Sequence, residues 1–290
     1  MTGIIGNYEM SLLTMVGITV TFALSLNLIT GLCGQISLGH AAFYGAGAYA
    51  AAMLTKAGVP FALALLAAAA VAAAIGLVVG LASLRVRHDF LAITTMGVGF
   101  LFIGIVRQQD ALGGTMGISS IPDPGLGKAG FMALCLASAG VVALFSLYVK
   151  RSWMGYAFDS IADDEDTARI VGINVPAYKL AAFAIGTGIA GVAGGLYAHN
   201  VGIIDPDSFG FIESITVLAM VVIGGNGSVW GVTVAAVMLS MLPHWFQFID
   251  NYKLLVYGGL VFAVMRFSPG GLAGLFAGGL ERLRRARMPS

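Results

Sequence analysis

Long runs without Asp, Glu, Lys or Arg alternate with short polar segments along this chain of 290 residues. The first run, Met10 to Thr55, has 46 residues and a natural break at Gly31–Gly34, so it can form two membrane-spanning helices of about 20 residues each. Later runs cover residues 57–84, 90–106, 129–149, 180–204, 211–224, 228–249 and 254–265. The pattern predicts an all-α, polytopic integral membrane protein: one transmembrane domain, residues 1–290, with nine crossings in a range of eight to ten.

Residues 34–47 interrupt the first run with polar side chains and glycines. Backbone that leaves the helix at membrane depth is tolerated only where protein or a water-filled cavity satisfies its hydrogen bonds. We therefore predict at least one broken or re-entrant segment here, which either lines the translocation pathway or makes a polar contact between helices. The candidate pathway residues are Gln35, Ser37, Gly39, His40, Tyr44 and Gly45.

A second break, residues 224–228, is equally rich in glycine. Its sequence suits either a tight turn between two helices or a re-entrant tip that lines a cavity. Gly224, Gly225 and Asn226 join the candidate pathway set on the second interpretation.

Lys and Arg are distributed unevenly between alternate loops. Eleven lie at residues 85–87, 150–179 and 266–287, whereas four lie in the other set of loops. Because cytoplasmic loops are enriched in Lys and Arg, we expect a cytoplasmic C-terminus and, with nine crossings, an external N-terminus. We expect the basic tail, residues 271–290, to lie at the cytoplasmic membrane surface and contact anionic lipid, with partner docking as the alternative.

The one long polar loop runs from Lys150 to Lys179. Residues 162–171 contain good helix formers and predict a short helix that Gly172 ends as a C′ glycine. Its acidic residues lie near the helix N-terminus and Arg169 near the C-terminus, the arrangement that the helix dipole favours. A loop of this length usually has a function. We therefore favour a role in partner docking over the alternative that the loop is only a solvated acidic segment. The acidic residues are Asp163, Asp164, Glu165 and Asp166.

Composition supports the membrane assignment and excludes several functions. Only 10% of the residues are charged, where an ordinary soluble domain has about 25%. A net charge of +1 without a basic stripe argues against nucleic-acid binding. No phosphate-binding loop, nucleophile–base pair or metal-ligand spacing occurs in the sequence. We therefore expect a non-catalytic protein without a cofactor, with any ATP hydrolysis in another chain.

Several blocks of the sequence resemble the branched-chain amino acid (LIV-type) permeases of ABC importers. Residues 166–172 resemble the EAA coupling loop, with Asp166 and Thr167 replacing its Glu and first Ala, and with Ala168 and Gly172 at matching positions. The other blocks are residues 27–43, 172–183, 190–198 and 213–231, and they occur in the family's order.

The resemblance implies a permease subunit of a multi-component importer in a bacterial cytoplasmic (inner) membrane, which moves branched-chain or related amino acids by alternating access. Its implied partners are ABC ATPase subunits, a second permease subunit, identical or homologous, and an extracytoplasmic solute-binding protein. Residues 163–168 and Gly172 would then contact or position the ATPase. Related systems carry urea or short amides, so the exact substrate stays open. The alternative is a stand-alone ion-coupled transporter or channel that uses Glu213 and the histidines.

Overall fold

The computed structural model describes residues 6–84, 88–245, 252–268 and 270–274. These residues form helices, and the predicted all-α class is confirmed for them. The amino-terminal half contains α1 (Asn7–Leu26), the π-helix η1 (Asn27–Leu32), α2 (His40–Lys56), α3 (Phe61–Ser83), α4 (His88–Gln108), and the short 3-10 helices η2 (Asp110–Leu112) and η3 (Gly114–Met116). The rest contains α5 (Gly127–Arg151), α6 (Trp153–Asp163), α7 (Glu165–Ile170), α8 (Val175–Val201), η4 (Asp207–Phe209), α9 (Phe211–Gly224), α10 (Val229–Trp245) and α12 (Lys253–Phe267).

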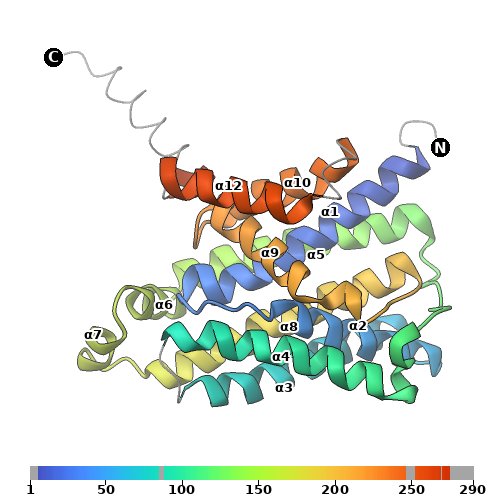
Figure 1. The fold of residues 1–290 in the computed structure, drawn as a ribbon, viewed down its shortest axis with the longest axis horizontal. Helices are drawn as coiled ribbons and strands as arrows, with labels where there is room; N and C mark the ends of the chain where they lie inside the picture. Colours follow the sequence, from blue (N-terminus) through green and yellow to red (C-terminus); the bar gives the residue numbers. More distant parts are fainter. Residues whose placement is uncertain (1–5, 85–87, 246–251, 269, 275–290) are drawn as a thin grey trace, which may run out of the picture.

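The long helices lie side by side along the long axis of the molecule (Figure 1). Within the described ranges, seven helical stretches are long and apolar enough to cross a membrane, and the protein is polytopic. Within the described residues each predicted run falls on a helix, but α2 has only 17 residues. An α-helix of that length spans about 25 Å.

Small residues bring the central helices close together. The buried alanines Ala64, Ala68 and Ala72 recur every fourth residue on α3 and face α8. At Gly191 on α8, a Cβ atom would collide with the backbone of Ala68 and the side chain of Ala72. Because lipid offers no hydrophobic driving force between helices, such close packing is the main attraction available inside a membrane.

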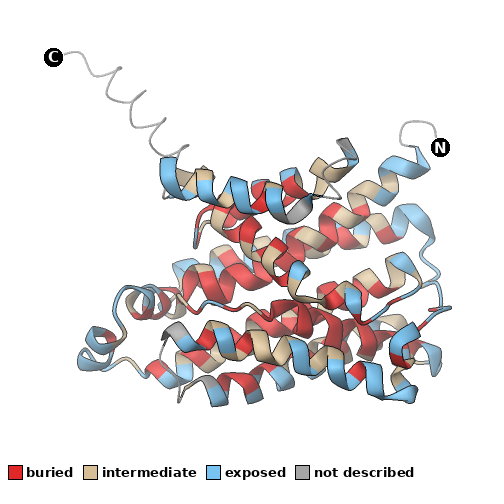
Figure 2. Ribbon diagram, viewed as in Figure 1, coloured by how far each residue is buried: buried red, intermediate tan, exposed pale blue. Residues whose placement is uncertain are grey.

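Buried residues concentrate in α1, α2, α8 and α9, whereas α3, α4 and α12 expose large apolar side chains (Figure 2). Exposed leucines and phenylalanines are expected where a helix faces lipid. Cys33 and Cys135 are buried and free.

The two ends of the bundle differ. Helices α6 and α7 project from one end (Figure 1), which we call the α7 end. Residues 109–126 lie at the opposite end, where Ile118 and Ile204 exchange two backbone hydrogen bonds of 2.9 Å. Most of the basic tail, from residue 275 onward, lies outside the described residues, and so do residues 85–87.

Candidate functional site

The predicted broken segment lies between η1 and α2. Residues 33–39 leave the helix, and hydroxyls of three other elements hydrogen-bond to the backbone of this segment or of the first turn of α2. Thr30 Oγ1 in η1 donates to the Gln35 carbonyl at 2.9 Å. Thr95 Oγ1 on α4 accepts from Leu38 N at 3.0 Å, and Ser214 Oγ on α9 accepts from Ala41 N at 3.0 Å. The non-helical backbone is therefore held by protein, as its position in a membrane demands.

The polar side chains of this segment point into the packed interior. Gln35, Ser37 and His40 are all buried. His40 Nε2 lies 2.8 Å from Ser25 Oγ, and Gln35 Nε2 donates to the Lys179 carbonyl at 3.4 Å. Gln35 Oε1, Ser37 Oγ and His40 Nδ1 have no hydrogen-bond partner among the described residues. The segment thus keeps several polar atoms inside the bundle, next to α1, α8 and α9.

Two of the candidate glycines are sites of close approach. A Cβ atom at Gly39 would collide with the carbonyl of Thr95 on α4. A Cβ atom at Gly45 would collide with the rings of Phe102 and Phe209. Both positions allow α2 to pack against its neighbours, and neither lines the large cavity described below.

Residues 224–228 form a tight turn between α9 and α10. Ser228 N donates to the Gly225 carbonyl at 3.0 Å, and Gly225 has a φ of +102°, which favours glycine. Gly227 N donates to Asn27 Oδ1 at 3.1 Å, and Lys150 Nζ donates to the Gly227 carbonyl at 2.7 Å. The turn is therefore docked on η1 and on the end of α5, and the structure supports the turn over the re-entrant tip.

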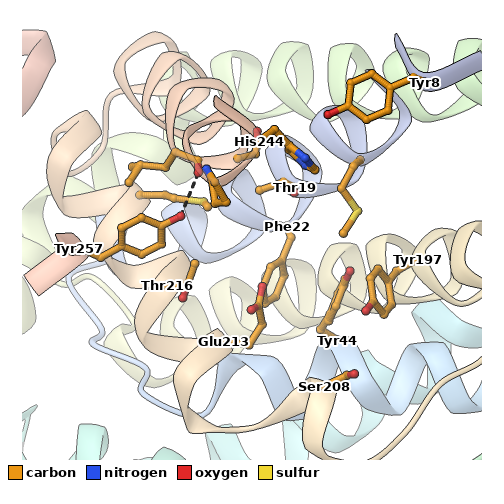
Figure 3. A pocket seen from close by; sticks show the side chains of 15 residues that line it. Tyr8, Thr19, Phe22, Tyr44, Tyr197, Ser208, Glu213, Thr216, His244 and Tyr257 are labelled. Carbon is orange, nitrogen blue, oxygen red and sulfur yellow. Dashed lines mark hydrogen bonds between the residues drawn. The ribbon is translucent and has the colours of Figure 1, made fainter. Parts of the chain in front are cut away.

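A cavity of about 740 Å³ lies between α1, α2, α8, α9, α10 and α12 (Figure 3). On α1 its lining residues Tyr8, Met15, Thr19 and Phe22 share one face and extend over 15 residues, or about 21 Å of helix. The remaining lining residues are Tyr44, Tyr197, Ser208, Glu213, Thr216, Met220, Leu239, Ser240, Pro243, His244 and Tyr257. Of the predicted pathway residues, only Tyr44 lines this cavity.

Aromatic rings form one wall of the cavity. The rings of Phe22 and Tyr44 are stacked with their centroids 4.3 Å apart, and Tyr197 lies 5.5 Å from Tyr44. Behind Phe22, the His40 ring stacks at 5.4 Å. The series His40, Phe22, Tyr44 therefore connects the broken segment to the cavity wall. Figure 3 shows Glu213 reaching from α9 toward Phe22 and Tyr44.

Sequence reasoning missed most of this lining. Glu213 was predicted as an ion relay only under the alternative function, and nothing in the sequence indicated Tyr8, Tyr197 or Tyr257. The spacing of Tyr8, Met15, Thr19 and Phe22 on one face of an apolar helix is the signal that could have found part of it. The rest depends on helices far apart in the sequence.

The acidic loop forms two helices where the sequence predicted one. The predicted helix over residues 162–171 is interrupted at Asp164, which is extended and separates α6 from α7. The Asp164 side chain accepts a hydrogen bond from Thr167 N and caps α7. Hydrogen bonding from the Thr167 backbone lowers the pKa of Asp164. The prediction of one continuous helix is wrong because an Asp three residues before a free N–H competes for that donor. Gly172 does end α7, with a φ of +89°.

The outer surface of the projection carries both acidic and apolar side chains. Asp163, Asp166 and Thr167 are exposed. The side chains of Ile170 and Val171 are 84% and 69% exposed. Such apolar groups outside the bundle indicate a contact surface.

Ala168 has a different place. It is 1% exposed and belongs to a cluster with Phe158, Ile161 and Val175. Its small side chain lets α7 lie against α6 and the start of α8. Ala168 therefore stabilises the projection from inside. The sequence interpretation had instead placed it in contact with the ATPase.

Glu165 connects the projection to the bundle. Its carboxylate pairs with Arg169 within α7 and with Lys179 on α8, each at 2.7 Å. The side chain of Lys179 is only 9% exposed, so this ion pair is shielded from solvent and from salt. Since the Lys179 carbonyl accepts from Gln35, a short path of contacts runs from α7 to the broken segment.

Comparison with known proteins identifies relatives over most of the chain. Residues 9–265 match the family described as "Branched-chain amino acid transport system / permease component". The high-affinity branched-chain amino acid transport system permease proteins LivM of Salmonella typhimurium and of Escherichia coli are each 34% identical to this chain over 298 residues, covering 92% of this chain and 70% of the relative. The permease protein BraD of Pseudomonas aeruginosa is 32% identical over 131 residues, or 44% of this chain and 42% of the relative. No solved structure matches the chain significantly.

Proposed function

Because the chain belongs to the permease component family of branched-chain amino acid transport systems, we propose that it is the translocation subunit of an ABC importer. In this proposal a separate ATPase dimer drives it by alternating access, and the substrate is a branched-chain or related amino acid. The observation that carries the proposal is the α6–α7 projection, which joins an exposed contact surface to the buried broken segment through Glu165, Lys179 and Gln35.

The projection suits a surface that receives force from a partner. An isolated acidic loop would move freely, but α7 is fixed to α8 by the Glu165–Lys179 ion pair and to α6 by the buried Ala168. A push on α7 therefore reaches α8, whose residues contact α1, α2 and α3. Lys150, at the end of the helix that leads into the projection, donates a hydrogen bond to the Gly227 carbonyl and so links α5 to the turn between α9 and α10.

Alternating access would involve the cavity and the broken segment: the path is closed in one state, and movement of the segment opens it in the other. The stacked rings of His40, Phe22 and Tyr44 close the interior side of the cavity. Side-chain hydroxyls of η1 and α4 hydrogen-bond to the adjacent residues 33–39, and a hydroxyl of α9 bonds to the first turn of α2. Relative movement of α4 and α9 would break the bonds from Thr95 and Ser214 and open the path. The chain itself performs no covalent step in this scheme.

The positions of the partners follow from the two ends. We place the ATPase subunits and the cytoplasm at the α7 end, in agreement with the Lys and Arg count, and the cytoplasmic C-terminus belongs to the same proposal. The solute-binding protein would dock at the opposite end, which includes residues 109–126. A second permease subunit, identical or homologous, completes the pathway in the bacterial inner membrane.

The docking role of the projection can be tested by charge reversal. In the variant Asp163→Lys with Asp166→Lys, the permease should insert normally, while ATPase-subunit co-purification falls about tenfold at low salt and less at high salt. Like charges placed against a complementary surface cost up to a few kcal/mol, whereas exposed charges without a partner change stability by less than about 0.5 kcal/mol.

The matched control is Asp110→Lys with Asp123→Lys, two exposed carboxylates at the opposite end. This control should retain the ATPase subunits. If the Asp163 and Asp166 variant retained the ATPase subunits fully, the projection would be a solvated acidic loop and not a docking surface.

One observation favours a second candidate function. Glu213 lines the cavity, and an intramembrane carboxylate can serve as an ion or proton relay. In a carrier of that kind, an uncoupler would abolish uptake while ATP is maintained. In the proposed importer, uptake would continue under the same conditions.

A further inference from the structure

We propose that the junction between α5 and α6 binds the phosphate headgroups of anionic lipid through Arg151, Trp153 and Tyr156. Such a site would hold the base of the α6–α7 projection at the membrane surface. The inference rests on the proposed function only in naming the leaflet, which is the cytoplasmic one. It is carried by the exposed apolar stripe of α5, by the sharp turn at Ser152 and by the separation of charges along the projection.

One face of α5 is exposed and apolar up to its last turn. Val141, Leu144 and Tyr148 are 64%, 69% and 72% exposed, and their spacing of three and four residues places them on one side of the helix. Since α5 is long and apolar enough to cross a membrane, this face meets lipid. Arg151 follows Tyr148 by three residues and is also exposed. The lipid-facing stripe therefore ends in a tyrosine and an arginine.

The chain turns sharply where α5 ends. Ser152 is extended, with a φ of −91° and a ψ of 170°, and α6 begins at the next residue. A Cβ atom at Gly155 would collide with the last carbonyls of α5, so the first turn of α6 packs directly on the last turn of α5. Trp153 and Tyr156 belong to that first turn and are 87% and 64% exposed. Both rings therefore lie at the depth where α5 leaves the membrane.

These side chains have the chemistry of a membrane–water interface. Trp and Tyr concentrate at the level of the headgroups because each ring has an apolar body and a polar end. A guanidinium group can bind a phosphate through two parallel hydrogen bonds. No described residue forms an ion pair or hydrogen bond with the Arg151 side chain. The neighbouring Lys150 instead donates to the Gly227 carbonyl at 2.7 Å, so Arg151 is the cation of this pair that faces lipid.

The acidic residues lie farther along the projection. Asp159 and Asp163 are exposed beyond the first turn of α6, and Asp166 is exposed on α7. An anionic surface attracts the start of α6 at Arg151 and repels its acidic end, so the first turn stays at the membrane while α7 points into the water. The separation of charge thus assigns two surfaces to two partners, lipid at the base of the projection and the ATPase farther out.

Tryptophan fluorescence measures the depth of this junction directly. The chain has three tryptophans, and Trp230→Phe with Trp245→Phe leaves Trp153 as the single one. The full-length permease would be placed in nanodiscs of phosphatidylethanolamine and phosphatidylglycerol. A nitroxide on the lipid headgroup should quench Trp153 several-fold more strongly than a nitroxide deep in the acyl chains. Acrylamide dissolved in the water should quench it only weakly.

Ile170→Trp, in a chain whose native tryptophans are all replaced by Phe, is the matched control. Ile170 is 84% exposed, close to the 87% of Trp153, but it lies at the end of α7. Acrylamide should quench this variant strongly, and the headgroup nitroxide should not. If Trp153 responded as the control does, or most strongly to the deep nitroxide, the junction would not lie at the headgroups and the proposal would be wrong.

The preference for anionic lipid tests Arg151. Phosphatidylglycerol and phosphatidylcholine that carry the same nitroxide are compared as tracers in the same nanodiscs, and the ratio of their quenching constants at Trp153 reports the preference. Arg151→Gln should lower this ratio about fivefold, the contribution of one basic residue near an anionic surface, and Arg151→Lys should retain most of it. Lys128→Gln, which removes an exposed charge at the opposite end, should leave the ratio unchanged. An unchanged ratio in Arg151→Gln would overturn the site.

Co-purification in detergent separates lipid from the ATPase as the partner of this surface. Without added lipid, Arg151→Gln should retain the ATPase subunits fully, whereas the charge-reversal variant of Asp163 and Asp166 should lose them. Loss of the ATPase in Arg151→Gln would assign the surface to the ATPase and overturn the lipid site. Failure of the proposed function would appear separately, as absence of ATP-driven amino-acid uptake, because the quenching measurements do not require transport.

Discussion

Gly172 ends α7 in a backbone conformation that glycine adopts more easily than other residues. Its φ is +89°, and no atom lies within 4 Å of a Cβ built there, so a side chain adds backbone strain without a collision. Gly172→Val should cost about 1–3 kcal/mol locally and tilt α7. We expect several-fold lower transport with unchanged permease abundance, measured as uptake rate and as the amount of permease in isolated membranes.

Gly58 provides the matched control for this substitution. It has a φ of +86° and open space around its Cβ, but it follows α2 in a loop outside the projection. Gly58→Val should therefore introduce the same strain without affecting transport. Disappearance of the Gly172→Val permease from the membrane would make Gly172 a folding residue.

Single residues also show where sequence reasoning reaches its limit. Gly172 could be predicted as a helix end because its signal is local. Ala168 could not be placed, because its burial depends on Phe158 and Val175 in neighbouring elements. Glu213 was identified as an intramembrane carboxylate, but the aromatic rings beside it come from α1, α2 and α8.

At the scale of elements, the broken segment depends on hydroxyl groups from its neighbours. Thr95→Val keeps the shape of the side chain but leaves the Leu38 N–H without its acceptor. An unsatisfied buried donor costs about 1–3 kcal/mol. We expect a lower apparent melting temperature in detergent and a lower uptake rate, because the segment before α2 is no longer held.

The neighbouring Thr94 is the control for this change. Its Oγ1 donates to the Phe90 carbonyl within α4, at 2.9 Å, so Thr94→Val removes a hydroxyl from the same helix without touching the segment. Its melting temperature should stay close to that of the unchanged protein. Equal losses in both variants would show that α4 itself, and not the broken segment, is affected.

The elements were predictable to different degrees. Within the described residues, every apolar run fell on a helix because exclusion of charge from a membrane is visible in the sequence alone. The break before α2 was also predicted, from its glycines and polar residues. The division of the acidic helix at Asp164 was not, because a single capping hydrogen bond decides it.

On the scale of the whole molecule, contacts among the described residues connect three features. The cavity lies between α1, α9, α10 and α12 on one side and α2 and α8 on the other. The broken segment lies behind its aromatic wall, and the Glu165–Lys179 pair joins that segment to the projection. This arrangement supports a route by which events at α7 control access to the cavity.

The central claim, that ATP hydrolysis by partner subunits drives amino-acid transport through this chain, is tested most directly by uptake of radiolabelled leucine into proteoliposomes. The liposomes would contain the purified permease with its ATPase and sister permease, with the solute-binding protein outside and ATP inside. We expect accumulation that requires ATP and the binding protein and persists when an uncoupler and ionophores collapse all ion gradients. Accumulation without ATP that stops when those gradients collapse would contradict the account.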